Sequence, residues 1–202
     1  MPERKSRDEI LAEIELLVEK VIAPIREAGD DETADFYREE LFAYRIAQMN
    51  ALLYLNSCFS FPQVLYPGSG SDTVPHMVFG RNIIHTSLET YSGGDKQYFQ
   101  DMPGAQRVVC DNEMLPFGNG AFNCVLALDT DISHLTQWNN ELVRVLAPRG
   151  IMLVSNNSFT SDDEARGLLF STRKDMRLSY TNVVPGDTEK PIEFFGYEKM
   201  SR

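Results

Sequence analysis

Three side chains that can accept or donate a proton follow an apolar stretch of the chain. Asp129, Asp131 and His134 come directly after a run of residues that predicts a strand. A carboxylate or an imidazole in such a loop can act as a general base, and the same groups at close spacing can ligate a divalent metal. In a third interpretation, Asp131 or Ser133 caps a helix that begins near His134. The sequence leaves these alternatives open.

Two further segments have the composition of a ligand-binding edge. Asp111–Glu113 stands between an apolar strand pattern and a Leu-Pro-Phe turn, and Gly68–Gly70 ends an earlier apolar run. Glycines let the backbone turn tightly and approach a ligand closely. We therefore expect the two segments to face one crevice that holds a nucleoside group. A dinucleotide fingerprint would need glycine where Thr73 stands, and no Gly-Lys-Ser/Thr follows for a P-loop.

These segments need a sheet to bring them together, and the chain from Phe61 onwards has the pattern of one. Short β-rich runs alternate with helical or loop segments, which predicts a mostly parallel sheet wound by helices. The predicted strands cover residues 63–66, 82–86, 107–110, 123–128 and 151–155. Crossover helices are predicted over 72–79, 134–146 and near 162–170. Strands over 177–184 and 192–199 flank a Pro-Gly-Asp loop and predict a closing antiparallel hairpin.

The first part of the chain has a different pattern, that of two amphipathic helices. Ser6 and Glu9 fit a capping box, and apolar residues follow at helical spacing. Pro24 is expected to end or kink this helix, because proline lacks the amide proton and crowds the preceding turn. A second helix is predicted from about Thr33 to Leu55.

The apolar stripes of these two helices need a surface to cover. That surface is the rest of the chain, the mouth of a pocket or a second copy of the chain, so the pair is a candidate homodimer interface. Aromatic residues on the second helix either pack or line an acceptor pocket; they are Tyr37, Tyr44 and Tyr54. We divide the chain into an N-terminal helical extension, residues 1–60, and an α/β domain, residues 61–202.

Composition and charge narrow the class of protein. Hydrophobic residues make up 43% of the chain and charged residues 24%, as in ordinary globular proteins. The formal net charge of −11 is spread along the chain and leaves no evident basic patch, so we expect no nucleic-acid partner. No apolar run approaches the roughly 18 residues of a membrane helix, and the start of the chain lacks an apolar signal region. We expect a cytoplasmic protein without a membrane partner.

The α/β part resembles the class I S-adenosylmethionine-dependent methyltransferases, in particular the small methyltransferase domains. Three blocks carry the resemblance. Val64–Gly70 is similar to the family's glycine-rich first motif, and Asp111–Val125 is similar to its D-x-x-x-L-P-F and F-D-x-V pattern. Glu141–Gly150 is similar to its E-x-x-R-V-L-x-P-G-G turn. The resemblance implies a Rossmann-like sheet of seven mostly parallel strands with a C-terminal antiparallel hairpin. It also implies methyl transfer from S-adenosylmethionine to an acceptor, which we expect to be a small molecule.

The resemblance assigns cofactor contacts to particular residues. The glycine-rich segment would pass under the methionine part, the carboxylate after the third strand would accept a hydrogen bond from the adenine amino group, and its neighbours would line the adenine edge. These residues are Gly68, Ser69 and Gly70 for the first role, and Asp111, Asn112 and Glu113 for the others. An acidic residue after the second strand would bind the ribose hydroxyls, because a carboxylate offers paired acceptors. Glu89 is the candidate, with His85–Ser87 as the alternative.

The first motif departs from the family pattern. Tyr66 stands where the family usually has an acidic residue that helps hold the cofactor's amino group. Asp72 stands at the usual third glycine, and it either supplies the missing negative charge or only caps the following helix. Asp129 and His134 lie where the acceptor would meet the methyl group, and they are the candidate catalytic residues. The competing hypothesis is a methyltransferase-like binding or scaffold protein without turnover.

Overall fold

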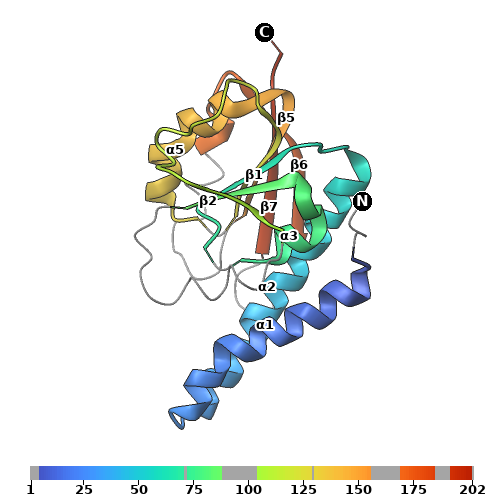
Figure 1. The fold of residues 1–202 in the computed structure, drawn as a ribbon, viewed down its shortest axis with the longest axis vertical. Helices are drawn as coiled ribbons and strands as arrows, with labels where there is room; N and C mark the ends of the chain where they lie inside the picture. The colour runs from blue at the N-terminus through green and yellow to red at the C-terminus, as the bar shows by residue number, and fades with distance from the viewer. Residues whose placement is uncertain are drawn as a thin grey trace.

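The computed structural model describes residues 5–70, 72–87, 104–128, 130–155, 169–184 and 192–201. A single sheet of seven strands lies at its centre, in the order β3-β2-β1-β4-β5-β7-β6 (Figure 1). The strands are β1 (Val64–Pro67), β2 (Ile83–Ser87), β3 (Gln106–Val109), β4 (Phe122–Ala127), β5 (Leu146–Ser155), β6 (Met176–Val184) and β7 (Ile192–Lys199). The α-helices are α1 (Arg7–Glu27), α2 (Asp31–Cys58), α3 (Val74–Phe79) and α5 (Ile132–Val145), and a 3-10 turn, η1 (Gly80–Asn82), follows α3.

Strands β1 to β5 are parallel, while β7 runs antiparallel to both β5 and β6. This topology confirms the predicted fold class and the closing hairpin. From β1 the chain builds the sheet outwards through β2 and β3, and then returns to add β4 and β5 on the other side. In open α/β sheets the carboxyl ends of the strands at such a reversal form the usual ligand crevice. The reversal therefore places a candidate site at the end of β1.

Strand β5 begins earlier than predicted. The turn expected over residues 147–150 is part of the strand, and pairing with β4 starts at Phe122 and Leu146 before the register shifts. Arg149 has a φ of +62°, and a Cβ on Gly150 would lie 2.8 Å from the carbonyl oxygen of Ala147. The turn residues are therefore accommodated as an irregularity within a longer strand.

The two N-terminal helices form as predicted, with longer bounds. Ser6 and Glu9 make the reciprocal capping box of α1, and Asp30 caps α2 by accepting from the amide of Thr33. Helix α1 continues past Pro24 to Glu27, without the one backbone hydrogen bond that proline cannot donate. In Figure 1 the pair extends beyond the sheet, away from α5. Within the described ranges, no helix is both long and apolar enough to cross a bilayer.

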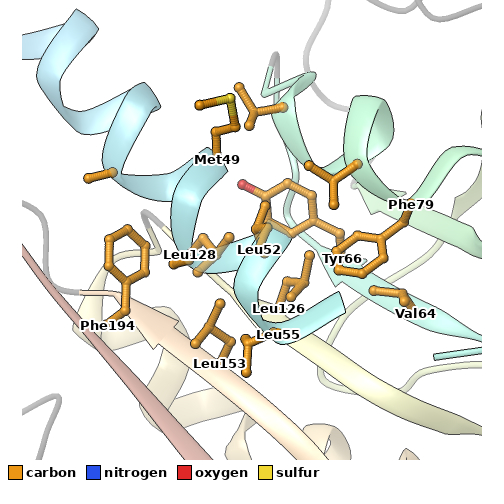
Figure 2. Packing of buried hydrophobic residues seen from close by; sticks show 14 of the residues in the cluster. Met49, Leu52, Leu55, Val64, Tyr66, Phe79, Leu126, Leu128, Leu153 and Phe194 are labelled. Carbon is orange, nitrogen blue, oxygen red and sulfur yellow. The ribbon is translucent and has the colours of Figure 1, made fainter. Parts of the chain in front are cut away.

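Each face of the sheet is covered by a different helical layer. Figure 2 shows Met49, Leu52 and Leu55 of α2 packed over β1, β4 and β5. The opposite face packs on α5 through Leu135, Trp138 and Leu142. Because successive strand residues alternate between faces, Val64 and Tyr66 belong to the first core and Leu65 to the second. The helical pair and the sheet thus share one core, and the domain boundary at residues 60 and 61 stays a prediction.

Candidate cofactor site

The carboxyl ends of β1 and β2 and the segment after β3 meet at one edge of the sheet. The amide of Gly68 donates to the carbonyl of Thr86 at 2.9 Å, and the hydroxyl of Thr86 donates to Oδ1 of Asn112 at 2.6 Å. Thr86 and Asn112 are both buried. A Cβ on Gly68 would lie 3.9 Å from Nδ2 of Asn112. The structure therefore brings the two segments singled out in the sequence, 68–70 and 111–113, to the same place.

Gly68 and Gly70 differ in the surroundings that an added Cβ atom would meet. Gly68 has a φ of +62°, and a Cβ there would lie 3.0 Å from the Trp138 ring. Gly70 has a φ of +50°, and no atom of the described residues lies within 4 Å of its Cβ position. Both backbones adopt the left-handed region that favours glycine. Gly68 thus allows α5 to pack closely, while no described residue fills the space beside Gly70.

Asp111 lies at the rim of this edge, where its carboxylate organises a turn. Its Oδ1 accepts from the amide of Glu113 at 2.8 Å, and its carbonyl accepts from the amide of Met114 at 3.1 Å. Asp111, Glu113 and Met114 are all exposed. The segment therefore presents an oriented carboxylate beside the buried amide of Asn112.

The Leu-Pro-Phe turn that follows is fastened to α5 by a glutamate and an arginine. Arg144 donates to both carboxylate oxygens of Glu141 at 2.7 Å and to the carbonyl of Phe117 at 2.8 Å. The hydrogen bond from Arg144 lowers the pKa of Glu141. The E-x-x-R pattern noted in the sequence thus acts as a clamp on the loop after β3.

Asp72 is buried, and its two carboxylate oxygens have different partners. Oδ1 accepts from the amide of Val74 at 3.1 Å, at the start of α3. Oδ2 accepts from the Tyr66 hydroxyl at 2.7 Å and from Nε2 of Gln48, and it lies 2.9 Å from Nη1 of Arg45. The two roles expected for Asp72 were a helix cap and a negative charge near the cofactor. Oδ1 contacts the first amide of α3, but the N-cap residue of α3 is Thr73, and it has no side-chain cap hydrogen bond. The charge of Asp72 is paired with α2.

The sequence interpretation missed Arg45 and Gln48. Gln48 is fully buried between Ala47 and Met49 on α2. A polar residue in the middle of an apolar helix face is the one signal that would have pointed to it, because buried polar groups need hydrogen-bond partners. Tyr66, which Figure 2 shows with its hydroxyl directed toward α2, has a pKa raised well above its usual value by burial and then by the charge of Asp72. It therefore stays a neutral donor.

The end of β2 carries the alternative ribose-binding stretch, His85–Ser87. The hydroxyl of Ser87 accepts from Arg107 at 2.7 Å, and Thr86 is engaged with Asn112. His85 is fully buried beside the Tyr66 ring, and burial, followed by the nearby His76, lowers its pKa to about 4. The main ribose candidate, Glu89, lies outside the described residues.

Two hydroxyl groups near the glycine-rich segment are buried without a partner in the part of the chain that the structure describes. They are Oγ of Ser69 and Oγ1 of Thr73, on residues that are 3% and 4% exposed. A buried polar group without a hydrogen bond costs about 1–3 kcal/mol. A polar ligand or an ordered water at this position would remove that cost.

In the loop proposed for catalysis, the capping interpretation of Asp131 is confirmed. Asp131 accepts from the amide of Ser133 at 2.7 Å and caps α5. His134 is exposed, and its ring stacks on Trp138 with 5.1 Å between centroids. Asp129 lies outside the described residues. Among the residues that are described, no three His, Cys, Asp or Glu side chains are grouped to hold a metal ion.

No protein-family model and no curated protein matches the sequence. Solved structures do match the fold. The N-methyltransferase NodS from Bradyrhizobium japonicum WM9 has a TM-score of 0.59 at 10% identity, over 78% of this chain and 97% of that one. The magnesium protoporphyrin IX methyltransferase ChlM from Synechocystis PCC 6803 has a TM-score of 0.60 at 14% identity, over 81% and 83%. The chain has the class I methyltransferase fold.

The class I methyltransferase fold does not by itself decide the reaction. The [4+2]-cyclase SpnF matches with a TM-score of 0.57 at 14% identity, over 77% of this chain and 81% of that one. One fold commonly carries several activities, and function depends on the residues of the site. The activity of this chain must therefore be argued from its own side chains.

Proposed function

We propose that this protein binds S-adenosylmethionine at the carboxyl ends of β1 to β3 and transfers its methyl group to a small-molecule acceptor. The observation that carries the proposal is the meeting of Gly68–Gly70 with Asp111–Glu113 at one edge of a class I methyltransferase sheet. Two of the matching structures support the choice of cofactor. NodS was solved with S-adenosylhomocysteine and ChlM with S-adenosylmethionine.

The groups around this edge fit an adenosyl ligand. Asp111 offers an oriented carboxylate for the adenine amino group, with Asn112 and Glu113 beside it. Ser69 and Thr73 have buried hydroxyl groups that no described residue satisfies. Within the described part of the chain, no atom lies within 4 Å of the Cβ position of Gly70, which leaves room for the ligand to approach the backbone. Glu89 completes the proposed site as the ribose-binding residue.

Tyr66 and Asp72 have a supporting role in this proposal. Oδ2 of Asp72 already receives three donor groups, so its charge is balanced inside the protein. We assign both residues to the wall of the cofactor site, where they hold the glycine-rich segment in place.

Bound S-adenosylmethionine supplies an electrophilic methyl group on its sulfonium centre. An acceptor atom would displace the sulfur at this carbon, so that the carbon–sulfur bond would break and S-adenosylhomocysteine would be released. The chain orients the acceptor and takes the proton that it loses. We assign the proton transfer to Asp129 and His134, on the loop and first turn after β4. Stacking on Trp138 fixes the ring of His134.

The remaining partner assignments are also proposals. A net charge of −11 disfavours a polyanionic acceptor, so we propose a small molecule and no nucleic-acid partner, in the cytoplasm. The helical pair exposes apolar side chains, including Leu16 at 70% and Phe36 at 57%. We propose that these residues pair with a second copy of the chain.

Calorimetric titration with S-adenosylhomocysteine tests the cofactor assignment. We expect the wild-type protein to bind, and Asp111→Ala to raise the Kd by about 10- to 100-fold, as for loss of a hydrogen bond to a charged group. Asp35→Ala, which changes an exposed aspartate on α2, serves as the control and should bind normally. Absence of binding to the wild-type protein at millimolar ligand would overturn the proposal and support the scaffold hypothesis.

A further inference from the structure

Helix α2 contributes two polar side chains to the wall of the candidate site. Arg45 and Gln48 lie one turn apart, and Nη1 of Arg45 donates to Oε1 of Gln48 at 3.0 Å. Both reach Oδ2 of Asp72, two residues after Gly70. Gln48 is fully buried, and the side chain of Arg45 is 15% exposed. Helix α2 of the N-terminal pair is therefore connected directly to the glycine-rich segment that would pass under the cofactor.

The charge of Asp72 depends on this connection. A carboxylate that is 5% exposed is costly unless an opposite charge and hydrogen-bond donors replace the lost water. Arg45 supplies the charge, while Tyr66 and Gln48 supply the neutral donors. Oδ1 accepts from the amide of Val74 at the start of α3, so both carboxylate oxygens of Asp72 have hydrogen-bond partners.

The segment before Asp72 has little conformational preference of its own. Gly68 and Gly70 both have positive φ, and glycine adopts many other backbone conformations at similar cost. The amide of Asp72 also donates to the carbonyl of Ser69 at 3.0 Å, so the position of Asp72 determines the path of the turn. An anchored Asp72 is thus a means of keeping a glycine-rich turn in one conformation.

We propose that Arg45 is a positioning residue of the cofactor site, which acts through Asp72 to hold Gly68–Gly70 in the ligand-binding conformation. The inference rests on the proposed function, since it concerns the same site. It makes the helical pair a required part of that site.

The test measures the Kd for S-adenosylhomocysteine in four variants. Arg45→Met and Asp72→Asn should each raise the Kd at least tenfold. The double variant Arg45→Met/Asp72→Asn should have the same Kd as Asp72→Asn alone, because Arg45 acts through that carboxylate. Arg45→Lys should recover most of the lost affinity, because it restores the charge.

Arg38→Met is the matched control. Arg38 lies on the same helix and pairs with Glu19 at 2.7 Å, but this pair is exposed and lies between the two N-terminal helices. The control should leave the Kd unchanged. The double variant leaves no unpaired buried charge, so it is the variant best suited to remain folded if Arg45→Met does not.

Two results would overturn the inference while leaving the cofactor assignment intact. One is wild-type affinity in Arg45→Met or in the double variant. The other is a double variant whose loss equals the product of the two single losses, which would mean that Arg45 acts independently of Asp72. Failure of the wild-type protein to bind would instead refute the proposed function itself.

Discussion

The backbone amide of Leu115 donates a hydrogen bond of 3.0 Å to Oε2 of Glu141, which lies 26 residues later in the chain. The carbonyl of Leu115 in turn accepts from Nη2 of Arg144 at 3.0 Å. One residue of the loop after β3 is thus bound through both of its backbone groups to neighbouring turns of α5. The position of Asp111–Glu113 therefore depends on a helix that follows it in the sequence.

Replacement of this glutamate should affect both stability and binding. Glu141→Ala leaves the Leu115 amide without its acceptor and removes the carboxylate that pairs with Arg144, so we expect the free energy of unfolding to fall by about 1–3 kcal/mol. The Kd for S-adenosylhomocysteine should also rise, because the loop that carries Asp111 loses its clamp. Urea denaturation and calorimetric titration measure the two effects. As a control, Glu198→Ala removes a carboxylate that pairs with Arg177 on the hairpin, and it should leave the Kd unchanged. If the two variants changed the Kd equally, the proposed role of Glu141 in holding the loop would be wrong.

His85 should make the stability of the protein depend on pH below neutrality. Its folded pKa of about 4 lies below the unfolded value near 6.5, so the unfolded chain binds the extra proton first as the pH falls. The free energy of unfolding should therefore decrease between pH 6.5 and pH 4, by up to about 3 kcal/mol. His85→Phe removes this contribution. Urea denaturation of both proteins at pH 7 and pH 4.5 should show the smaller loss in the variant, and parallel pH profiles would refute the assignment.

The two glycines of the first motif should respond differently to alanine. At both positions a Cβ is strained by positive φ, at a cost of about 1–2 kcal/mol. Gly68→Ala must in addition displace the Trp138 ring from 3.0 Å, whereas Gly70→Ala meets no described atom within 4 Å. Thermal denaturation should rank the wild type, Gly70→Ala and Gly68→Ala in order of falling stability. A Gly70→Ala variant as unstable as Gly68→Ala would show that the space beside Gly70 is filled.

The proposed dimer gives a prediction about molecular mass. Light scattering after gel filtration should give twice the chain mass of 22.9 kDa for the wild-type protein. Leu16→Glu, which places a charge among the exposed apolar residues of α1, should shift the mass to that of one chain. Leu178→Glu on β6 alters another exposed leucine, outside the helical pair, and should leave the mass unchanged. A monomeric wild-type protein would remove the dimer from the proposal.

The spacing of apolar residues in the sequence was sufficient to predict most of the fold. The predicted strands agree with β1 to β4 to within one residue at each end, because alternating or continuous apolar runs between turn residues reflect burial directly. The prediction was less accurate at the start of β5, because residues of a Pro-Arg-Gly turn belong to a strand that pairs with β4. The residue types of a turn do not reveal that a neighbouring strand, here β4, provides hydrogen-bond partners for the same residues.

The residues of the candidate site also differ in whether the sequence could reveal them. Gly68–Gly70 and Asp111–Glu113 could be selected from the sequence, because positive-φ glycines and a carboxylate at the end of a strand are local features. Arg45 could not, because its partner Asp72 is 27 residues away and nothing in the spacing of α2 indicates which surface it covers.

The amino-acid sequence by itself was enough to predict most strands and helices and to select the two segments that meet at the sheet edge. Each of these features depends on residues within a few positions of one another. The tertiary structure decided which charges face each other. Asp72 could have pointed at a ligand or into the protein, and the docking of α2 placed Arg45 against it. A buried carboxylate takes the nearest counter-charge, and only the packing of distant helices determines which one that is.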